Sequence, residues 1–314
     1  DLNQKNIIVD KLILFNDMLR SENFNKLMVI LAEIEHVCYQ PSIKGIDQLH
    51  HLINQTKMMF PGIVSELMVA IFSDDFYTKI VYSFLQDIER EIVATVRSEF
   101  PWYYALIDYL KQTVREPEEK FNVAIRGSFI ISAYKRAVSF HKEQKRDVDV
   151  DVITNGGNIT NELSNFLKFP IPVEYNKSYF QPSVPDKDGL RIDFTIRDIS
   201  KSKSLRIVDF FPFNLCLIGE KLYLSMYLGY QTELGEATYH RFFNIFKLIE
   251  TETISLPQKQ MYNNIHPTIF LRLVKRISNG WNMDSQNLNQ LMHAIKSLTG
   301  NGSFKCKEKI FFTL

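Results

Sequence analysis

The segment from Arg146 to Thr154 alternates aspartate with valine, reading Arg-Asp-Val-Asp-Val-Asp-Val-Ile-Thr. Such alternation predicts a β-strand, in which every second residue lies on the same face of the sheet. Asp147, Asp149 and Asp151 would then share one face and repel one another. A solvated edge strand tolerates this repulsion, whereas a strand inside a domain needs cations to offset it. The segment is therefore either an exposed acidic edge or a carboxylate cluster that binds metal.

A second motif precedes this segment. Val123–Ile125 predicts a short apolar strand, Gly127 and Ser128 follow it, and the residues from Ser128 to about Phe140 predict a helix. The beginning of a helix binds phosphate through its N–H groups and its dipole. Glycine lets the backbone approach the phosphate, and the serine hydroxyl can donate a hydrogen bond to it. The arrangement of strand, Gly-Ser and helix therefore predicts a phosphate-binding loop.

Two further aspartates could complete a metal site. Asp193 lies in the expected strand Leu190–Ile196, and Asp209 lies near the end of the expected strand Leu205–Phe211. Carboxylate oxygens and substrate phosphates are ligands that Mg²⁺ prefers. Two such ions can activate a hydroxyl and stabilise a leaving oxygen in phosphoryl transfer. A carboxylate trio beside a phosphate-binding loop therefore favours phosphoryl or nucleotidyl transfer.

Over roughly residues 121–215, these motifs in this order resemble the DNA polymerase β-like nucleotidyltransferase superfamily. The resemblance implies that Gly127 and Ser128 bind the triphosphate of an NTP. It also implies that Asp149 and Asp151 bind two Mg²⁺ or Mn²⁺ ions, together with a third aspartate. We choose Asp149 and Asp151 over the pair that begins at Asp147 because the apolar run after Asp151 continues the strand. Asp147 then has a supporting role or is exposed.

The third carboxylate stays open between Asp209 and Asp193. We favour Asp209 because the segment after it, Phe-Phe-Pro-Phe-Asn, resembles the one that follows the third aspartate in poly(A) polymerases of large DNA viruses. Under this assignment the catalytic and metal-binding residues are Asp149, Asp151 and Asp209, with Asp193 as the alternative. Asp193 fits the same role because it also lies on a strand expected near the acidic one.

The long stretch between Ser128 and Asp149, with Lys145 and Arg146 before the acidic strand, resembles poly(A) polymerases of poxviruses and giant viruses. This resemblance implies a viral enzyme of mRNA processing that adds AMP from ATP to RNA 3′ ends without a template. It is compatible with a processivity or other partner subunit. It implies a cytoplasmic location, in the viral factory or the virion.

The spacing of apolar residues along the chain changes near Lys120. Before it, apolar residues recur at helical spacing, and after it strands alternate with helices until helices return from Glu236. We therefore expect an α+β protein in three parts: a helical N-terminal domain (1–120), a nucleotidyltransferase core with a mixed sheet and flanking helices (121–235), and a mainly helical C-terminal region (236–314). Expected C-terminal helices are Tyr239–Glu250, Thr268–Ile277 and Gln286–Leu298, and the tail Phe304–Thr313 alternates as a last strand does.

Composition excludes several other classes of protein. The net charge is +1, far below that of a dedicated duplex-DNA coat, and 45% of the residues are hydrophobic, as in a globular protein. The three cysteines are far apart, so neither a zinc site nor a disulfide framework is expected, and a reducing compartment is favoured. The sequence contains no apolar run long enough to span a membrane.

Competing functions stay open. The same chemistry could use another acceptor, as in a second-messenger synthase, a tRNA-end nucleotidyltransferase or an enzyme that nucleotidylates protein. A catalytically inactive scaffold or processivity subunit is the non-enzymatic alternative, although a scaffold has no need for clustered carboxylates. Arg272, Lys275 and Arg276 lie at helical spacing and could line an RNA groove or form a solvated face. A basic stretch around Lys135 and Arg136 carries the same two interpretations.

Overall fold

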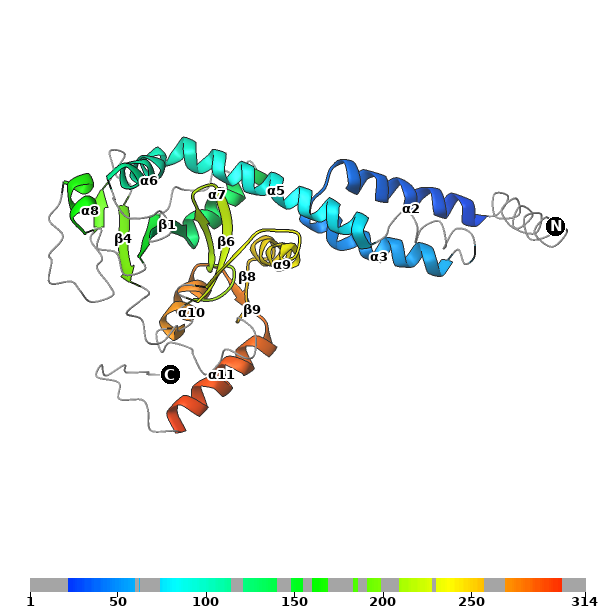
Figure 1. Ribbon diagram of the computed structural model, residues 1–314. Helices are drawn as coiled ribbons and strands as arrows, with labels where there is room; N and C mark the ends of the chain where they lie inside the picture. The colour runs from blue at the N-terminus through cyan, green and yellow to red at the C-terminus, as the bar shows by residue number, and fades with distance from the viewer. Residues whose placement is uncertain are drawn as a thin grey trace, which may run out of the picture. The chain divides into compact units, whose positions relative to one another are not determined.

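The computed structural model describes residues 22–59, 62, 74–113, 121–139, 148–154, 160–168, 183–185, 191–198, 209–227, 230–256 and 269–300. The chain divides into two compact units. Unit 1 comprises Asp1–Asp87 and Gly235–Phe243, and unit 2 comprises Ile88–Leu234 and Asn244–Leu314. The described residues combine helices with a small mixed sheet, which confirms the α+β class (Figure 1).

Unit 1 contains a helical hairpin formed by α2 (Glu22–Tyr39) and α3 (Ile43–Met59), followed by the first half of α5 (Asp74–Glu99). The Ser42 hydroxyl begins α3 by accepting a hydrogen bond from the Gly45 N–H at 3.0 Å, as an N-cap does. The apolar stripe predicted from the sequence is buried on α2, and α3 buries a matching stripe. These residues are Leu27, Ile30, Ile34 and Val37 on α2, and Ile43, Ile46, Leu49 and Ile53 on α3.

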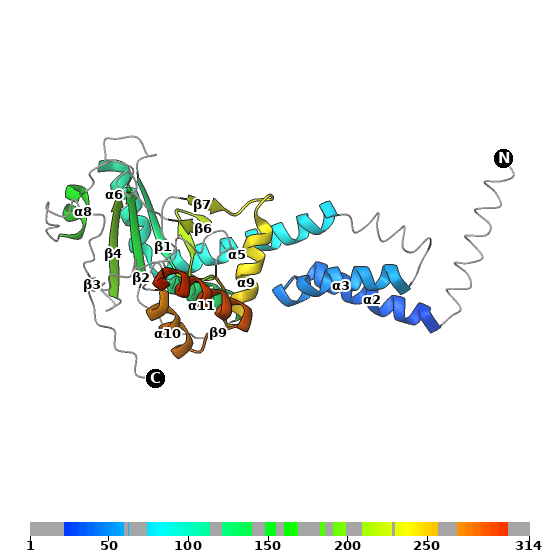
Figure 2. The same ribbon diagram turned by 90° about the horizontal axis from the view of Figure 1, so that it is seen from below.

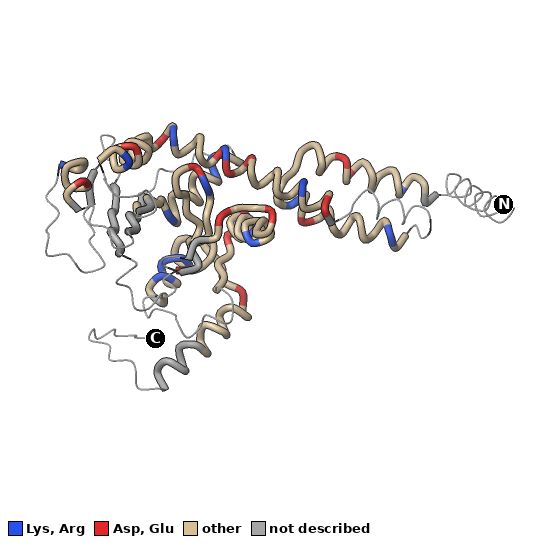
Figure 3. The backbone as a smooth tube through the Cα atoms, viewed as in Figure 1, with Lys and Arg blue, Asp and Glu red and all other residues tan. Residues whose placement is uncertain are grey.

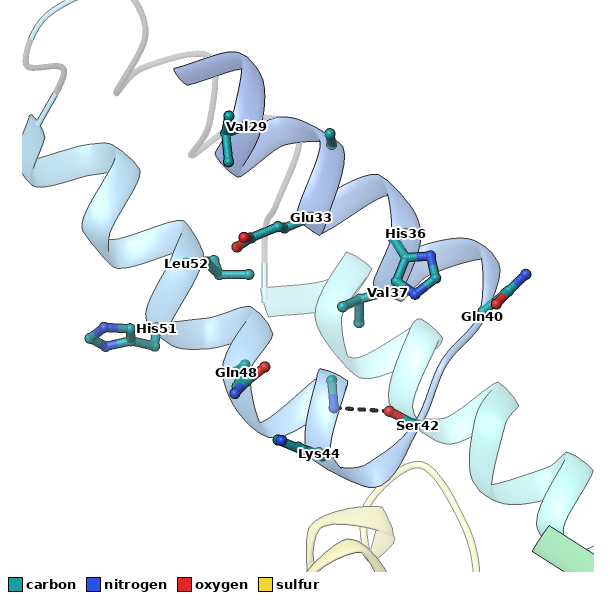
Figure 4. Close-up of a pocket in the computed structure, with 12 residues that line it drawn as sticks. Val29, Glu33, His36, Val37, Gln40, Ser42, Lys44, Gln48, His51 and Leu52 are labelled. Carbon is teal, nitrogen blue, oxygen red and sulfur yellow. Dashed lines mark hydrogen bonds between the residues drawn. The ribbon is translucent and has the colours of Figure 1, made fainter. Parts of the chain in front are cut away.

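A groove of about 830 Å³ runs between α2 and α3 (Figure 4). Its lining mixes apolar side chains such as Val37 and Leu52 with polar ones such as Glu33, His36 and His51. The two histidines come from different helices and lie apart in Figure 4. Within the part of the chain that the structure describes, no group of acidic, histidine or cysteine side chains here could hold a metal ion.

Unit 2 is built on a seven-stranded sheet with the order β3-β4-β2-β1-β5-β6-β7. Neighbouring strands are antiparallel except β2 and β4, which run parallel. Because parallel neighbours need a crossover, α8 (Thr160–Leu167) lies in the connection between β2 and β4. The strands are β1 (Phe121–Arg126), β2 (Val148–Thr154), β3 (Ser183–Pro185), β4 (Arg191–Asp198), β5 (Leu215–Ile218), β6 (Lys221–Tyr227) and β7 (Tyr230–Glu233).

Helices and a second small sheet complete unit 2 (Figures 1 and 2). The small sheet pairs β8 with β9 in parallel. Helix α9 crosses the boundary between the units, because its first residues belong to unit 1. The remaining elements are α6 (Pro101–Thr113), α7 (Ser128–Ser139), α9 (Tyr239–Glu250), β8 (Thr253–Ile254), α10 (Ile269–Ser278), β9 (Asn282–Met283) and α11 (Ser285–Gly300).

Most predicted elements are observed, but the strands β3, β7, β8 and β9 were not predicted, and one expected strand differs among the described residues. Of the expected strand Leu205–Phe211, only residues 209–211 are described. These three residues form no strand, and Phe211 makes an isolated β-bridge with Ser255. The end of this segment is therefore a turn that leads into β5, where the Phe213 N–H donates to the Phe210 carbonyl oxygen. The expected strand Phe304–Thr313 lies outside the described residues.

The Tyr103 hydroxyl joins α6 to the middle of the sheet. It lies 2.8 Å from the Val123 carbonyl oxygen and 3.1 Å from that of Leu217, and it accepts a hydrogen bond from the Gly219 N–H at 2.9 Å. Burial raises the pKa of Tyr103 well above its usual range, so the hydroxyl stays protonated and can donate. A single side chain thereby satisfies polar groups of β1 and of the β5–β6 turn.

We expect Tyr103→Phe to lower the free energy of unfolding of unit 2 by about 2 kcal/mol, because buried backbone groups would lose their partner. Urea titration followed by tryptophan fluorescence measures this, since Trp102 and Trp281 both belong to unit 2. Tyr39→Phe is the control because Tyr39 is 80% exposed. Equal stabilities of the two variants would show that the Tyr103 hydrogen bonds contribute nothing.

Candidate active site

The Gly127–Ser128 pair joins β1 to α7, as predicted. Gly127 has a φ of +65°, in the left-handed region that glycine adopts without strain. Its N–H donates to the Leu215 carbonyl oxygen at 3.0 Å, and its own carbonyl oxygen accepts the Ile131 N–H at 3.1 Å. The chain thus turns from strand to helix within one residue. Ser128, the first residue of α7, is half-buried.

Helix α7, which follows this turn, is packed into the core of unit 2. Phe129, Ile130 and Ala133 are buried, and the Tyr134 hydroxyl donates to Glu250 Oε1 at 3.0 Å. A helix leaves the N–H groups of its first turn without partners inside the helix, and its dipole is positive at that end. Packing therefore fixes the position of a helix N-terminus that can receive a phosphate group.

The acidic segment forms β2, an inner strand of the sheet between β4 and β1. Asp149 pairs with Asp193 of the parallel neighbour β4 and with Arg126 of the antiparallel neighbour β1. Val150 is fully buried, so Asp149 and Asp151, which flank it, belong to the opposite face of the strand. The register therefore brings Asp149, Asp151 and Asp193 to one face of two adjacent strands. Asp147 lies outside the described residues.

Asp209 has a different environment. Its carboxylate is buried, and Oδ1 accepts a hydrogen bond from the Phe210 N–H at 2.9 Å. Oδ2 accepts from Arg272 at 2.5 Å and from Arg276 at 2.8 Å. Of the two candidates for the third carboxylate, Asp193 is the one in register with Asp149, whereas Asp209 is held by two arginines of α10.

The basic residues of α7 are also engaged. Arg136 makes a bidentate ion pair with Glu99, through Nε at 2.9 Å and through Nη2 at 2.6 Å. Lys135 pairs with Glu252 at 2.8 Å. These contacts favour a structural role for both residues over the tracking of a nucleic-acid backbone. The other basic residues of this stretch lie outside the described residues: His141, Lys142, Lys145 and Arg146.

Two features near the site did not follow from sequence reasoning. Arg126 pairs in register with Asp149, because β1 turns out to be the other neighbour of β2. The ion pairs of Asp209 join residues that are far apart along the chain. The one local signal for them was the spacing of Arg272 and Arg276, since residues four apart on a helix share a face.

Among the side chains that the structure describes, which do not include those of Asp149, Asp151 and Asp193, no cluster of His, Cys, Asp or Glu could hold a metal ion. The donor set on β2 and β4 nevertheless fits Mg²⁺, because three carboxylate residues lie on adjacent strands of one sheet. Among the described helices, none combines the length and the apolar character that a membrane crossing needs.

No protein-family model and no curated protein sequence matches the chain. Three structures of CCA-adding enzymes are similar to part of it. A complex with CTP has a TM-score of 0.40 and 16% identity, over 66% of this chain and 45% of its own. The Thermotoga maritima enzyme with tRNA gives 0.38 and 15%, over 63% and 42%. An apo form gives 0.39 and 14%, over 68% and 47%.

All three TM-scores are 0.40 or lower, and all three identities are 16% or lower. The chain spans less than half the length of the solved structures that it matches.

Proposed function

We propose that this chain is a metal-dependent nucleotidyltransferase of the polymerase β-like kind. The observation that carries the proposal is the register of three neighbouring strands. Asp149 and Asp151 lie on β2, Asp193 lies opposite Asp149 on β4, and β1 on the other side of β2 leads into the Gly127 turn. A carboxylate cluster and a phosphate-binding helix N-terminus thus meet at neighbouring strands. Nucleotidyl transfer needs both, because the reacting group is a metal-bound triphosphate.

Gly127 and Ser128 would hold the triphosphate. The left-handed conformation of Gly127 turns the backbone sharply, so the first N–H groups of α7 become available to phosphate oxygens. The Ser128 hydroxyl can donate one more hydrogen bond. Because α7 is packed against the core, these donors keep their positions when the substrate binds, and little binding energy is lost in ordering them.

Asp149, Asp151 and Asp193 would hold two Mg²⁺ or Mn²⁺ ions. Bound there, the ions would lower the pKa of the attacking hydroxyl and would neutralise charge on the triphosphate. The carboxylates fix this arrangement from a rigid sheet, and their mutual repulsion is relieved by cations. In this assignment the third metal-binding carboxylate is Asp193 instead of Asp209, because Arg272 and Arg276 already form ion pairs with the Asp209 carboxylate.

The reaction we propose adds AMP from ATP to an RNA 3′ end. The 3′-oxygen of the RNA forms a bond to the α-phosphorus, the bond from that phosphorus to the β-phosphate oxygen breaks, and pyrophosphate leaves. The 3′-hydroxyl proton passes to solvent. The poly(A)-type acceptor and ATP rest on the spacing of Ser128 and Asp149 and on Lys145 and Arg146 before the acidic strand, which resemble viral poly(A) polymerases. A processivity or partner subunit belongs to the same proposal.

Primer extension tests this function. A labelled short RNA is incubated with the protein, Mg²⁺ or Mn²⁺, and each NTP separately. We expect a ladder of products with ATP alone. Addition limited to a few C or A residues would indicate a tRNA-end transferase instead, and labelled nucleotide products without RNA would indicate a second-messenger synthase. A folded protein that incorporates no nucleotide into RNA, small molecule or protein would contradict the proposal.

A further inference from the structure

Asp209 is a single carboxylate between two guanidinium groups. Its Oδ2 accepts hydrogen bonds from Arg272 and Arg276, and its Oδ1 accepts the Phe210 N–H. One negative charge cannot balance two positive charges, so this three-residue cluster keeps an excess positive charge. Figure 3 shows that basic positions gather on α10, the helix that carries both arginines.

The two arginines are not equivalent. The Arg276 side chain is only 10% exposed, and its guanidinium carbon lies 3.3 Å from the centroid of the Phe213 ring. Its Nε is buried and has no hydrogen-bond partner among the described residues. The Arg272 side chain is 43% exposed. A guanidinium has five N–H donors in a fixed fork, and Oδ2 of Asp209 occupies few of them. Arg272 therefore offers donors to solvent from a fixed position.

The cluster is joined to the beginning of α7 by the short segment from Asp209 to Leu215. At one end of this segment Asp209 holds the arginines, and at the other the Leu215 carbonyl oxygen accepts the Gly127 N–H at 3.0 Å. Between them, the Phe213 carbonyl oxygen lies 3.5 Å from the position that a Cβ at Gly127 would occupy. The guanidinium of Arg276 lies over the Phe213 ring. The excess positive charge is thus fixed close to the helix N-terminus that we assign to phosphate.

A purely structural ion pair would look different. Pairing a buried carboxylate needs one cation, and among the side chains that the structure describes, no second carboxylate balances the second arginine. An anion from solvent would balance the cluster, and phosphate suits the arginine fork because it can accept two parallel hydrogen bonds. The observed arrangement therefore fits an incomplete anion site better than a completed ion pair.

We propose that Arg272 binds a phosphate group next to the beginning of α7, and that Asp209 is the positioning residue that holds Arg272 there. The phosphate belongs either to the triphosphate of the nucleotide or to the backbone of the RNA, an assignment that rests on the proposed function. Arg276 supports the cluster, because its guanidinium contacts both Asp209 and the Phe213 ring.

Calorimetric titration of the full chain with inorganic tripolyphosphate, and separately with a short oligoadenylate, distinguishes the two sources. Arg272→Ala should weaken binding of one of these probes by roughly tenfold or more, as expected for the loss of a charge-assisted bidentate contact. Lys111→Ala is the matched control, because it removes the same charge from an exposed position on α6. Arg272→Lys should recover only part of the lost affinity.

Asp209→Asn tests the positioning role. It should raise KM for the nucleotide or for RNA, whichever probe depends on Arg272, with a much smaller change in kcat. Asp209→Glu should rescue part of the loss. Tryptophan fluorescence during thermal unfolding checks that each variant is folded, and Arg272→Ala alone decides the question if Asp209→Asn is unfolded, because Arg272 is half-exposed.

The inference is overturned if Arg272→Ala binds both probes within twofold of Lys111→Ala, or if the unaltered protein binds neither probe. Nucleotide incorporation measured on the same proteins separates this failure from failure of the proposed function. An Arg272→Ala protein that incorporates AMP normally would refute the phosphate site and leave the nucleotidyltransferase standing.

Discussion

Replacing Asp149 and Asp151 together by alanine should reduce nucleotide incorporation by roughly a thousandfold or more, because the variant would lose both metal ligands of β2. The metal ions contribute several kcal/mol of transition-state stabilisation, and each 1.36 kcal/mol corresponds to about a factor of ten in rate. The double variant should still fold, because removal of two neighbouring negative charges relieves repulsion on the strand. Steady-state incorporation of labelled ATP into RNA measures the effect.

The control for this result is a variant that removes two exposed carboxylates elsewhere, Glu35→Ala with Glu91→Ala. It should incorporate ATP at the rate of the unaltered protein. Binding of Mn²⁺, followed by the paramagnetic signal of the free ion, should be lost in the aspartate variant and retained in the control. Normal incorporation by the aspartate variant would remove the basis of the proposed chemistry.

Asp193→Asn should lower kcat by roughly a hundredfold or more with little change in the KM for ATP, since a metal ligand acts mainly on the transition state. The comparison with Asp209→Asn is informative, because both changes convert one carboxylate to an amide of the same size. Asp193 lies in register with Asp149, and Asp209 is bound by two arginines. We therefore expect the first variant to affect kcat and the second to affect KM.

The opposite pattern would assign the third metal-binding carboxylate to Asp209. In that case Asp193→Asn would leave kcat almost unchanged, and Asp209→Asn would abolish both Mn²⁺ binding and incorporation. Loss of folding in either variant is detected by tryptophan fluorescence, and the corresponding glutamate variants then provide the comparison. The assignment thus depends on two matched pairs of proteins.

Much of the fold follows from local sequence. The strand Val148–Thr154 and the helix Tyr239–Glu250 are observed at the predicted bounds, because alternation and helical periodicity are properties of neighbouring residues. The hairpin of β5 and β6 is equally local, since a Gly-Glu turn separates two apolar runs. Each of these elements is determined within a window of fewer than about twenty residues.

The choice between Asp193 and Asp209 could not be made from local sequence. Both follow apolar residues, so periodicity treats them alike. What distinguishes them is long-range pairing: β4 joins β2 in register, and Asp209 meets α10 much later in the chain. Such contacts depend on the packing of the whole domain. That packing cannot be read directly from a single sequence. The resemblance to viral poly(A) polymerases pointed to Asp209 for reasons unrelated to its neighbours in space.

The pairing of β2 on both sides has a consequence for how such proteins diverge. Asp149 is positioned by ladder hydrogen bonds to β1 and β4, so its place beside Gly127 does not depend on how long the chain between Ser128 and Asp149 is. Insertions or deletions in that connection would be neutral for chemistry, whereas the gain or loss of one residue between Asp149 and Asp151 would move the two aspartates to opposite faces. Related enzymes can therefore differ widely in motif spacing, and a search that fixes this spacing would overlook them.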